Sequence, residues 1–114
     1  MKEIKAYIRV NMLHKVIAAL EEAGFTDLTV IDVRAIRHGL QPSDLEYSVA
    51  MAERYMNVAK LEIVLQDQHV EQVKEIILQT AHTGRKGDGL LYVSSVGEAI
   101  HIRTGAPIFL PIDY

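Results

Sequence analysis

The sequence predicts one α+β domain in which two β-α-β units contribute to a single sheet. Segments in which apolar residues recur with a period of two alternate with segments in which they recur at helical spacing, and this alternation occurs twice along the chain. The chain has 114 residues, which provide one hydrophobic core and are too few for two domains. We therefore expect one folded unit with one functional site per chain.

The first unit begins with residues 2–10, in which apolar and polar side chains alternate as in a half-buried strand. Apolar residues then recur at helical spacing over 13–20. We expect Asn11 to be the N-cap of this helix and Gly24 to end it. Residues 28–36 are apolar and rich in β-branched side chains, which predicts a second strand.

The second unit repeats this order. Residues 60–65 alternate as a strand, and a helical stripe over 70–81 follows and ends at Thr83-Gly84. The apolar run 90–93 predicts another strand. Alternation over 100–103 predicts one more, short strand.

This order is that of the split β-α-β, or ferredoxin-like, βαββαβ fold, with residues 37–57 as a long insertion. Two helices cover only one face of a four-stranded sheet. The other face includes Tyr7, Ile31 and Val64, which form an exposed apolar patch if nothing covers them. We therefore expect this face to pack against other copies of the chain.

Composition argues against several classes of function. The formal net charge of −3 provides no cationic surface for a nucleic-acid backbone. The chain contains no cysteine, and its five histidines show no metal-ligand spacing. The strand pattern starts with no apolar signal segment before it, and no long apolar span follows. We expect a cytoplasmic protein with no metal site, no nucleic-acid partner and no catalytic residues.

Residues 83–89, Thr-Gly-Arg-Lys-Gly-Asp-Gly, contain three glycines between a helix and a strand. Glycines permit positive φ, so consecutive backbone N–H groups can converge on an anion, and Arg85 and Lys86 add positive charge. A Walker A loop is excluded because a strand, not a helix, follows. The alternative interpretation is a helix C-cap followed by a tight Asp-Gly turn.

Several strings in the second half of the chain together resemble the C-terminal signature of the nitrogen regulatory P-II family. They are Thr83-Gly84, Gly87-Asp88-Gly89, Leu91-Tyr92-Val93-Ser94 and Arg103-Thr104-Gly105, with Val96, Glu98 and Ile100 between them. The resemblance covers residues 1–105, which we take as the domain, and leaves 106–114 as an apolar tail in which two prolines exclude a helix. The resemblance implies a homotrimer that binds ATP, ADP or AMP in clefts between subunits.

The resemblance also implies which residues bind the nucleotide. These are Thr29, Ala35, Ile36, Arg37, His38, Glu62, Val64, Gly87, Asp88, Gly89, Leu90, His101 and Arg103. One subunit is expected to place residues 87–89 along the phosphates, with Ala35, Ile36 and Val64 nearby. The neighbouring subunit is expected to supply its Thr29 and Glu62 to the adenine and its Arg103 to the phosphates.

Two positions depart from the family pattern at this site. Leu90 stands where a phosphate-binding lysine is usual, and His101 stands where an arginine is usual. Each lost charge-assisted hydrogen bond is worth roughly 1.5 to 3 kcal/mol, so we expect ADP or AMP to compete better with ATP than in ordinary members unless Arg37, Arg85 or Lys86 compensates. His101 predicts affinity that rises as its imidazole becomes protonated.

The insertion 37–57 corresponds to the effector loop with which P-II proteins contact their targets, and a loop this long in a small domain is usually functional. Gly39 and Val58 replace the glutamine and lysine that help to bind 2-oxoglutarate, so sensing by that route is not expected. A capping box over 43–46 predicts a short amphipathic helix in the loop, a mobile loop being the alternative. The effector-loop residues of interest are Gly39, Leu45, Tyr47, Met51 and Tyr55, with Met51 at the position of the usual modified tyrosine.

These observations predict a nucleotide-binding regulator of a partner protein, which is expected to be a membrane transporter, a metabolic enzyme or a transcription factor. One alternative is a P-II relative that senses another small anion, such as bicarbonate, in carbon metabolism. The other is a small ferredoxin-like enzyme or metal-binding trimer, because a fold by itself does not determine function.

Overall fold

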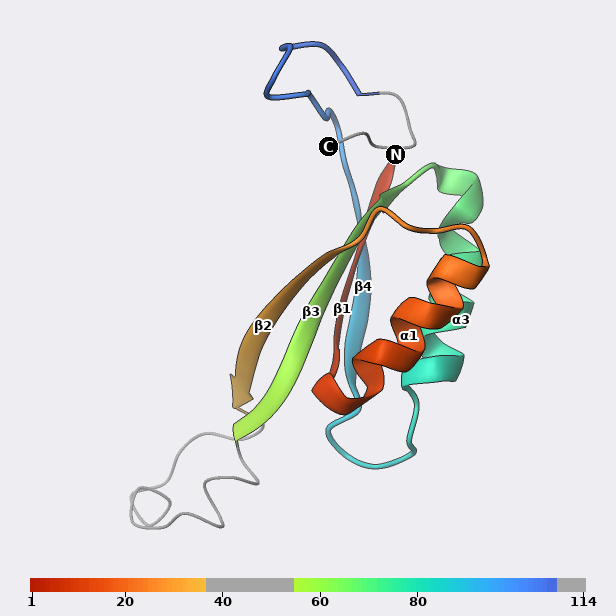
Figure 1. Ribbon diagram of the computed structural model, residues 1–114, viewed down its shortest axis with the longest axis vertical. Coiled ribbons are helices and arrows are strands. Elements are labelled where there is room, and N and C mark those ends of the chain that lie inside the picture. The colour runs from red at the N-terminus through yellow and green to blue at the C-terminus, as the bar shows by residue number, and fades with distance from the viewer. Residues whose placement is uncertain (37–54, 109–114) are drawn as a thin grey trace.

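The computed structural model describes residues 1–36 and 55–108 (Figure 1). Its elements in chain order are β1 (Lys2–Arg9), α1 (Val10–Glu22), β2 (Thr29–Ile36), β3 (Tyr55–Leu65), the 3₁₀ turn η2 (Asp67–His69), α3 (Val70–Ala81) and β4 (Gly89–Ser95). The strands form one sheet in the order β2-β3-β1-β4, and every neighbouring pair is antiparallel. The predicted ferredoxin-like α+β fold is confirmed.

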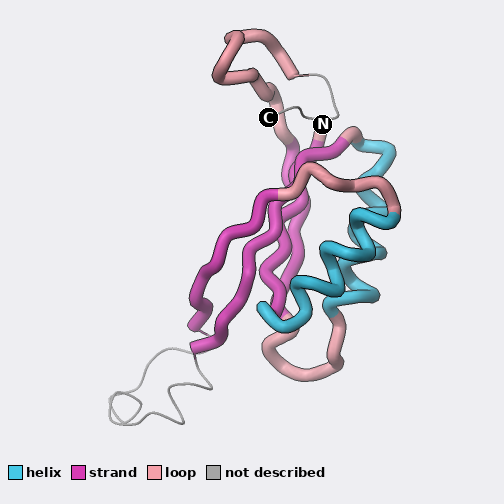
Figure 2. The backbone as a smooth tube through the Cα atoms, viewed as in Figure 1, coloured by secondary structure: helices cyan, strands magenta, loops and turns pink. Residues whose placement is uncertain are grey.

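Both helices lie on one face of the sheet (Figure 2). Alternate residues of the central strands point toward them, because successive side chains of a strand face opposite sides. On this face Ile4 of β1 is opposite Ile63 of β3, and the next same-face pair is Ala6 with Leu61. The core that results is closed by Val16, Leu20, Val73 and Ile77 of the helices, each at most 2% exposed.

Helix α1 begins two residues earlier than the sequence predicts. Its N-cap is Arg9, the last residue of β1, and no side chain caps the helix. The prediction that Asn11 is the N-cap is therefore wrong, because strand and helix follow each other without a turn and Asn11 lies inside the first turn. The predicted end is confirmed: Gly24 has φ +93°, and its N–H donates to the carbonyl of Glu21 at 2.9 Å.

Strand β3 begins at Tyr55, well before the alternating residues that predicted it. Its pairing with β2 continues to the end of that strand, where Ile36 is opposite Tyr55. Tyr55, expected in the effector loop, is therefore the first residue of a strand, and the loop is shorter at that end than 37–57. The other named loop residues, the predicted short helix, and the site residues Arg37 and His38 lie outside the described residues.

The segment after β4 folds back on itself instead of forming the predicted short strand over 100–103. Ile100 makes a single bridge with Pro107, and the N–H of Gly105 donates to the carbonyl of His101 at 2.8 Å. Gly105 has φ +72°, which lets the chain reverse at once. The first residues of the apolar tail belong to this turn, since the N–H of Ile108 donates to the carbonyl of Ala99 at 2.8 Å.

The sheet face opposite the helices carries apolar side chains. Ile31, Leu90 and Tyr92 are 41%, 59% and 42% exposed on it. Tyr7 is half-buried there, and the hydroxyl of Tyr92 donates to that of Tyr7 at 3.4 Å. This is the face for which sequence patterning predicts a covering partner. Within the described ranges, no helix has the length and apolar character needed to cross a membrane.

Candidate functional site

The loop between α3 and β4 is organised around the carboxylate of Asp88. Its Oδ2 accepts hydrogen bonds from the backbone N–H of Thr83 at 2.8 Å and of Gly84 at 2.9 Å. Its Oδ1 accepts from the Thr83 hydroxyl and, at 3.2 Å, from Nε of Arg9. The Asp88 side chain therefore folds the loop back on itself, and both of its oxygens are already used within the chain.

Arg9 reaches this loop from the end of β1. Besides its contact with Asp88, its Nη2 donates to the carbonyl oxygen of Lys86 at 2.7 Å. The Arg9 side chain is 19% exposed and that of Asp88 is 23% exposed, so water screens the pair only partly. The two contacts connect the loop to the end of β1, one of the two central strands of the sheet.

The same contacts determine the charge of the loop at neutral pH. The hydrogen bond from the Thr83 hydroxyl holds the pKa of Asp88 well below its usual range, and the N–H groups of Thr83 and Gly84 and the side chain of Arg9 act in the same direction. Asp88 is consequently ionised at neutral pH, and the adjacent guanidinium balances its charge.

The glycines of this loop adopt the conformations that the sequence predicts. Gly84, Gly87 and Gly89 have φ of +84°, +96° and +101°. At Gly89 space is also limiting, because a Cβ would lie 1.7 Å from the carbonyl oxygen of Tyr7. The alternative of a glycine-capped helix end is not what forms: the C-cap of α3 is His82, in an extended conformation.

The turn at residues 85–87 carries the backbone donors and the cations that an anion site requires. Within the part of the chain that the structure describes, the N–H groups of Lys86 and Gly87 donate to no protein acceptor. The side chains of Arg85 and Lys86 are exposed and form no ion pair with described residues. N–H groups without a protein acceptor, in a glycine-rich turn beside two cations, are a favourable arrangement for phosphate or carboxylate oxygens.

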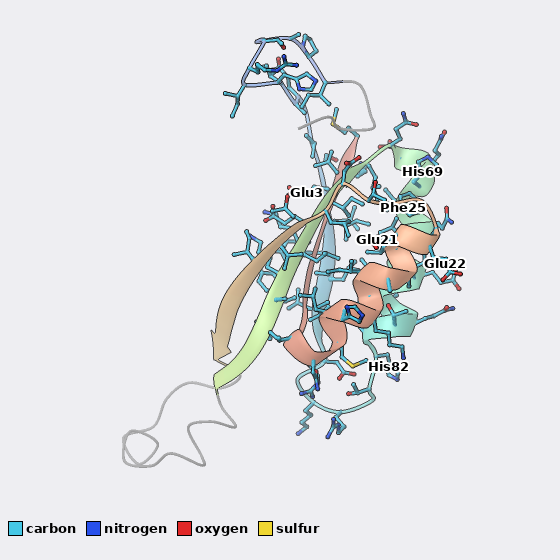
Figure 3. The ribbon with its side chains drawn as sticks, viewed as in Figure 1. Glu3, Glu21, Glu22, Phe25, His69 and His82 are labelled. Carbon is cyan, nitrogen blue, oxygen red and sulfur yellow. The ribbon has the colours of Figure 1, made fainter. Side chains whose placement is uncertain are left out.

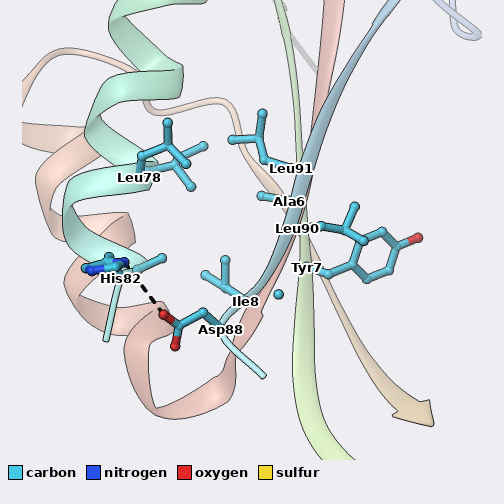
Figure 4. Close-up of a pocket in the computed structure, with 11 residues that line it drawn as sticks. Ala6, Tyr7, Ile8, Leu78, His82, Asp88, Leu90 and Leu91 are labelled. Carbon is cyan, nitrogen blue, oxygen red and sulfur yellow. Dashed lines mark ion pairs between the residues drawn. The ribbon is translucent and has the colours of Figure 1, made fainter. Parts of the chain in front are cut away.

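A pocket of about 200 Å³ lies on the inner side of the same loop (Figure 4). Its walls are mainly apolar and include Ile8, Leu78 and Leu91. At its mouth Nδ1 of His82 lies 3.7 Å from Oδ2 of Asp88. Figure 4 shows the side chain of Leu90 on the other side of β4, away from Leu78. Tyr7 and Leu90 are nevertheless among the residues that line the pocket, so the pocket and the open sheet face share these two residues.

The structure brings together the residues expected at the adenine. Thr29 of β2 is directly opposite Glu62 of β3, and Val64 lies two residues further along β3 on the same face. Oε1 of Glu62 is 2.8 Å from Nζ of Lys60, and this hydrogen bond raises the pKa of Lys60. Val64 was expected beside the glycine loop, but it is opposite Glu3, whereas Gly89 is opposite Ile8.

The expected phosphate-binding residues are divided between the two ends of the sheet. Five residues along β1 separate the level of Val64 from that of Gly89, a distance of about 16 Å. Arg103 and His101 follow β4, whereas Asp88 precedes it, and the seven residues of β4 span about 20 Å. Figure 1 shows the 97–108 segment at the opposite end of the sheet from the glycine loop.

Figure 3 shows the same separation, with His82 at the loop end and Glu3 and His69 toward the other. At the loop end lie residues 87–90 together with the last residues of β2, Ala35 and Ile36, where the effector-loop segment begins. One chain alone cannot place Arg103 beside Asp88. A site that uses both needs a second chain.

Sequence reasoning missed the part that Arg9 has in this site. Arg9 is a polar residue of the first strand and one of the positions to which the P-II resemblance extends, but the sequence assigned it no role in the site. Its contact with Asp88 joins residues 79 positions apart and depends on the pairing that puts Ile8 opposite Gly89. No local pattern reports that pairing, although an arginine at a strand end and an Asp-Gly at a strand start are compatible with it.

Comparison with known proteins gives concordant results. The family model described as Nitrogen regulatory protein P-II matches residues 1–106. A nitrogen regulatory protein P-II of Azospirillum brasilense is 36% identical over 105 residues, covering 92% of this chain and 94% of the relative. The P-II protein of Rhizobium meliloti strain 1021 is 37% identical with the same coverage. A "Nitrogen regulatory protein P-II 2" of Methanothermobacter thermautotrophicus is 38% identical over 109 residues, covering 92% of this chain and 91% of the relative.

Among solved structures, that of Arabidopsis thaliana PII bound to citrate superposes with a TM-score of 0.72 at 29% identity. The alignment covers 93% of this chain and 83% of the Arabidopsis chain. The similarity therefore extends over the whole ferredoxin-like domain and is not confined to the glycine loop.

Proposed function

Because this chain belongs to the nitrogen regulatory P-II family, we propose that it is a homotrimeric sensor that binds an adenine nucleotide between subunits and regulates a partner protein. P-II proteins are regulatory signal-transduction proteins and not enzymes. The alternative of a small enzyme is therefore set aside.

The observation that supports a site between subunits is the division of the predicted residues along the sheet. Gly87 and Asp88 lie at one end of β4 and Arg103 lies beyond the other. Only an adjacent copy can bring an Arg103 to the glycine loop. The open sheet face, with Ile31 and Leu90 largely exposed, is the surface that such copies would cover.

In this proposal the phosphates contact the outer side of the glycine loop, where the N–H groups of Lys86 and Gly87 are available. The neighbouring subunit supplies Thr29 and Glu62 to the adenine and Arg103 to the phosphates. Electrostatic attraction holds the phosphates, while the paired strand residues provide a fixed surface for the base.

Signalling follows from where the site lies. Strand β2 leads into the effector-loop segment at Ile36 and β3 leaves it at Tyr55, both at the same end of the sheet as the glycine loop. A nucleotide that binds one arrangement of this end more tightly increases the population of that arrangement. The partner, a membrane transporter, a metabolic enzyme or a transcription factor, then meets a different loop surface.

The phosphate end of the site favours fewer phosphates than in ordinary members. Leu90 presents an exposed apolar side chain in place of the usual lysine, and His101 replaces an arginine. We expect ADP or AMP to bind at least as tightly as ATP. Val58, at the position of the lysine used for 2-oxoglutarate, is 3% exposed and apolar, so it offers no charge to a dicarboxylate.

A second candidate is a sensor of a small anion such as bicarbonate or a carboxylate. It is favoured by one finding, the citrate bound to the similar Arabidopsis PII structure. The outer side of the glycine loop is equally suited to carboxylate and phosphate oxygens. In both cases the chain acts in the cytoplasm, with residues 1–105 as the sensing domain, followed by the apolar tail 106–114.

Titration calorimetry of the purified protein with ATP, ADP, AMP, citrate and bicarbonate tests both proposals, with native mass spectrometry for the number of subunits. A trimer that binds ADP or AMP at micromolar concentration without hydrolysis supports the nucleotide sensor. Binding of citrate or bicarbonate without any nucleotide supports the second candidate. A monomer, or binding of none of these compounds at millimolar concentration, contradicts both.

A further inference from the structure

We propose that Arg9 is a positioning residue, which holds the glycine loop in its anion-accepting conformation and couples the loop to the start of β3 without contacting the ligand. The statement about the ligand rests on the proposed function. The statement about the loop does not, because it concerns contacts within one chain.

Arg9 holds the loop at two points on either side of Gly87. Its Nε donates to Oδ1 of Asp88 at 3.2 Å, and its Nη2 donates to the carbonyl oxygen of Lys86 at 2.7 Å. The carbonyl of Lys86 and the N–H of Gly87 belong to one peptide unit. In a trans peptide these two groups point in opposite directions.

Drawing the Lys86 carbonyl toward the guanidinium therefore turns the Gly87 N–H away from it, to the outer side of the loop. That N–H donates to no acceptor in the described residues, and it is one of the groups proposed to receive the phosphate. Gly87 has φ +96°, a conformation that most other residues avoid. Arg9 thus helps to hold an arrangement that the ligand needs already formed.

The guanidinium itself is poorly placed to bind an anion. Its charge is balanced by Asp88, and its side chain is 19% exposed. The exposed cations of the loop are Arg85 and Lys86, whose side chains form no ion pair with described residues. An anion that paired with Arg9 would have to displace a carboxylate that the folded loop already provides.

Arg9 also connects the loop with the strand that leaves the effector-loop segment. It is opposite Val58 of β3, three residues after Tyr55, where that strand begins. It is also the N-cap of α1. A change in the glycine loop that breaks the contacts of Arg9 with Lys86 or Asp88 therefore frees the Arg9 side chain near the start of β3. This contact can couple the glycine loop to the start of β3.

The test compares Arg9→Met, Arg9→Lys and wild type, with Lys74→Met as the matched control. Lys74 also forms an ion pair, with Glu71 at 3.1 Å, but on the exposed side of α3. Two readouts are used: amide hydrogen exchange at Thr83 and Gly84 in the ligand-free protein, and the affinities for AMP, ADP and ATP. Exchange at Val73 and Ile77, buried in the core, reports whether the fold is intact.

We expect Arg9→Met to speed exchange at Thr83 and Gly84 by about tenfold while core exchange stays unchanged, because one charge-assisted hydrogen bond to Asp88 is lost. The affinities for all three nucleotides should fall by the same factor of about ten, because the substitution affects the loop and not a phosphate contact. Arg9→Lys should recover part of both effects, because an ammonium can reach one of the two acceptors. Lys74→Met should change neither.

If the loss of affinity in Arg9→Met grows with the number of phosphates, Arg9 contacts the ligand. If hydrogen exchange at Thr83 and Gly84 is unchanged in Arg9→Met, the loop keeps its conformation without Arg9. Either result overturns the proposal. If the wild-type protein binds no nucleotide, the proposed function fails, and the exchange measurements alone then decide the positioning role. If Arg9→Met unfolds, the same comparison is made with Arg9→Lys.

Discussion

At the scale of single residues, the glycine loop owes its form to one carboxylate and three glycines. Four donors converge on Asp88, and Gly89 passes so close to Tyr7 that no side chain fits. The sequence marked the glycines correctly, since all three have positive φ. The resemblance assigns Asp88 to the phosphates, and the structure adds that its side chain accepts four hydrogen bonds within the chain.

Replacing Gly89 by alanine should destabilise the protein by about 2 to 4 kcal/mol, because the added Cβ meets a backbone carbonyl and φ is positive. Urea unfolding measures the change. Gly97→Ala is the matched control, since nothing lies within 4 Å of its added Cβ, and it should change stability by less than about 0.5 kcal/mol. Equal effects of the two substitutions would contradict this account.

Asp88 should also give stability that depends on pH. Its pKa is lower in the folded chain than in the unfolded chain, so its contribution is complete above the ordinary carboxyl pKa of about 4 and is lost as pH falls toward the folded value. Denaturant midpoints of wild type and Asp88→Asn are compared from pH 7 downward. The wild type should be more stable at pH 7, and the two curves should converge below about pH 4. Curves that stay parallel would be incompatible with this role.

At the scale of elements, periodicity predicted both helices and the central strand, because each buries one stripe or one face. It failed where an element is determined by its neighbour. Strand β3 extends back to Tyr55 because β2 pairs with it to Ile36, and the expected strand over 100–103 turns back because Gly105 reverses the chain.

Helix α3 offers a direct check of which stripe is buried. Ile77 is 2% exposed and Leu78 is 58% exposed, although they are adjacent in the sequence. Ile77→Ala should cost about 2 to 5 kcal/mol because it leaves a cavity in the core, while Leu78→Ala should cost less than about 1 kcal/mol. Thermal or urea unfolding of the two variants measures both losses of stability. A larger loss of stability for Leu78→Ala than for Ile77→Ala would mean that the face of α3 with Leu78, and not the face with Ile77, packs against the core.

At the scale of the whole molecule, the main consequence of the fold is that the predicted site residues lie at two ends of the sheet. Loop residues 87–89 and Arg103 are separated by the length of β4. A second copy is needed to complete the site, in agreement with the open sheet face that sequence patterning identified. The trimer remains a prediction that rests on this geometry and on family membership.

Subunit mixing tests that geometry. Gly87→Val disrupts the loop and Arg103→Ala removes the cation, so each variant alone should lose nucleotide affinity by tenfold or more. In trimers formed from an equal mixture, about one seam in four combines an intact loop with an intact Arg103, and binding should return there. Calorimetry of the mixture counts the recovered sites. No recovery in confirmed mixed trimers would mean that both residues act within one chain.

What the sequence by itself determined are the features that depend on short range: the two β-α-β units, the helical stripes, the positive-φ glycines and the string that resembles P-II proteins. Only the tertiary structure decided that Arg9 and Asp88 meet across 79 positions, that Thr29 is opposite Glu62, and that Arg103 lies far from the glycine loop. The physical reason is that periodicity records which face of an element is buried. Strand register and strand order, which bring distant residues together, arise from packing between elements and leave no periodic trace in the chain.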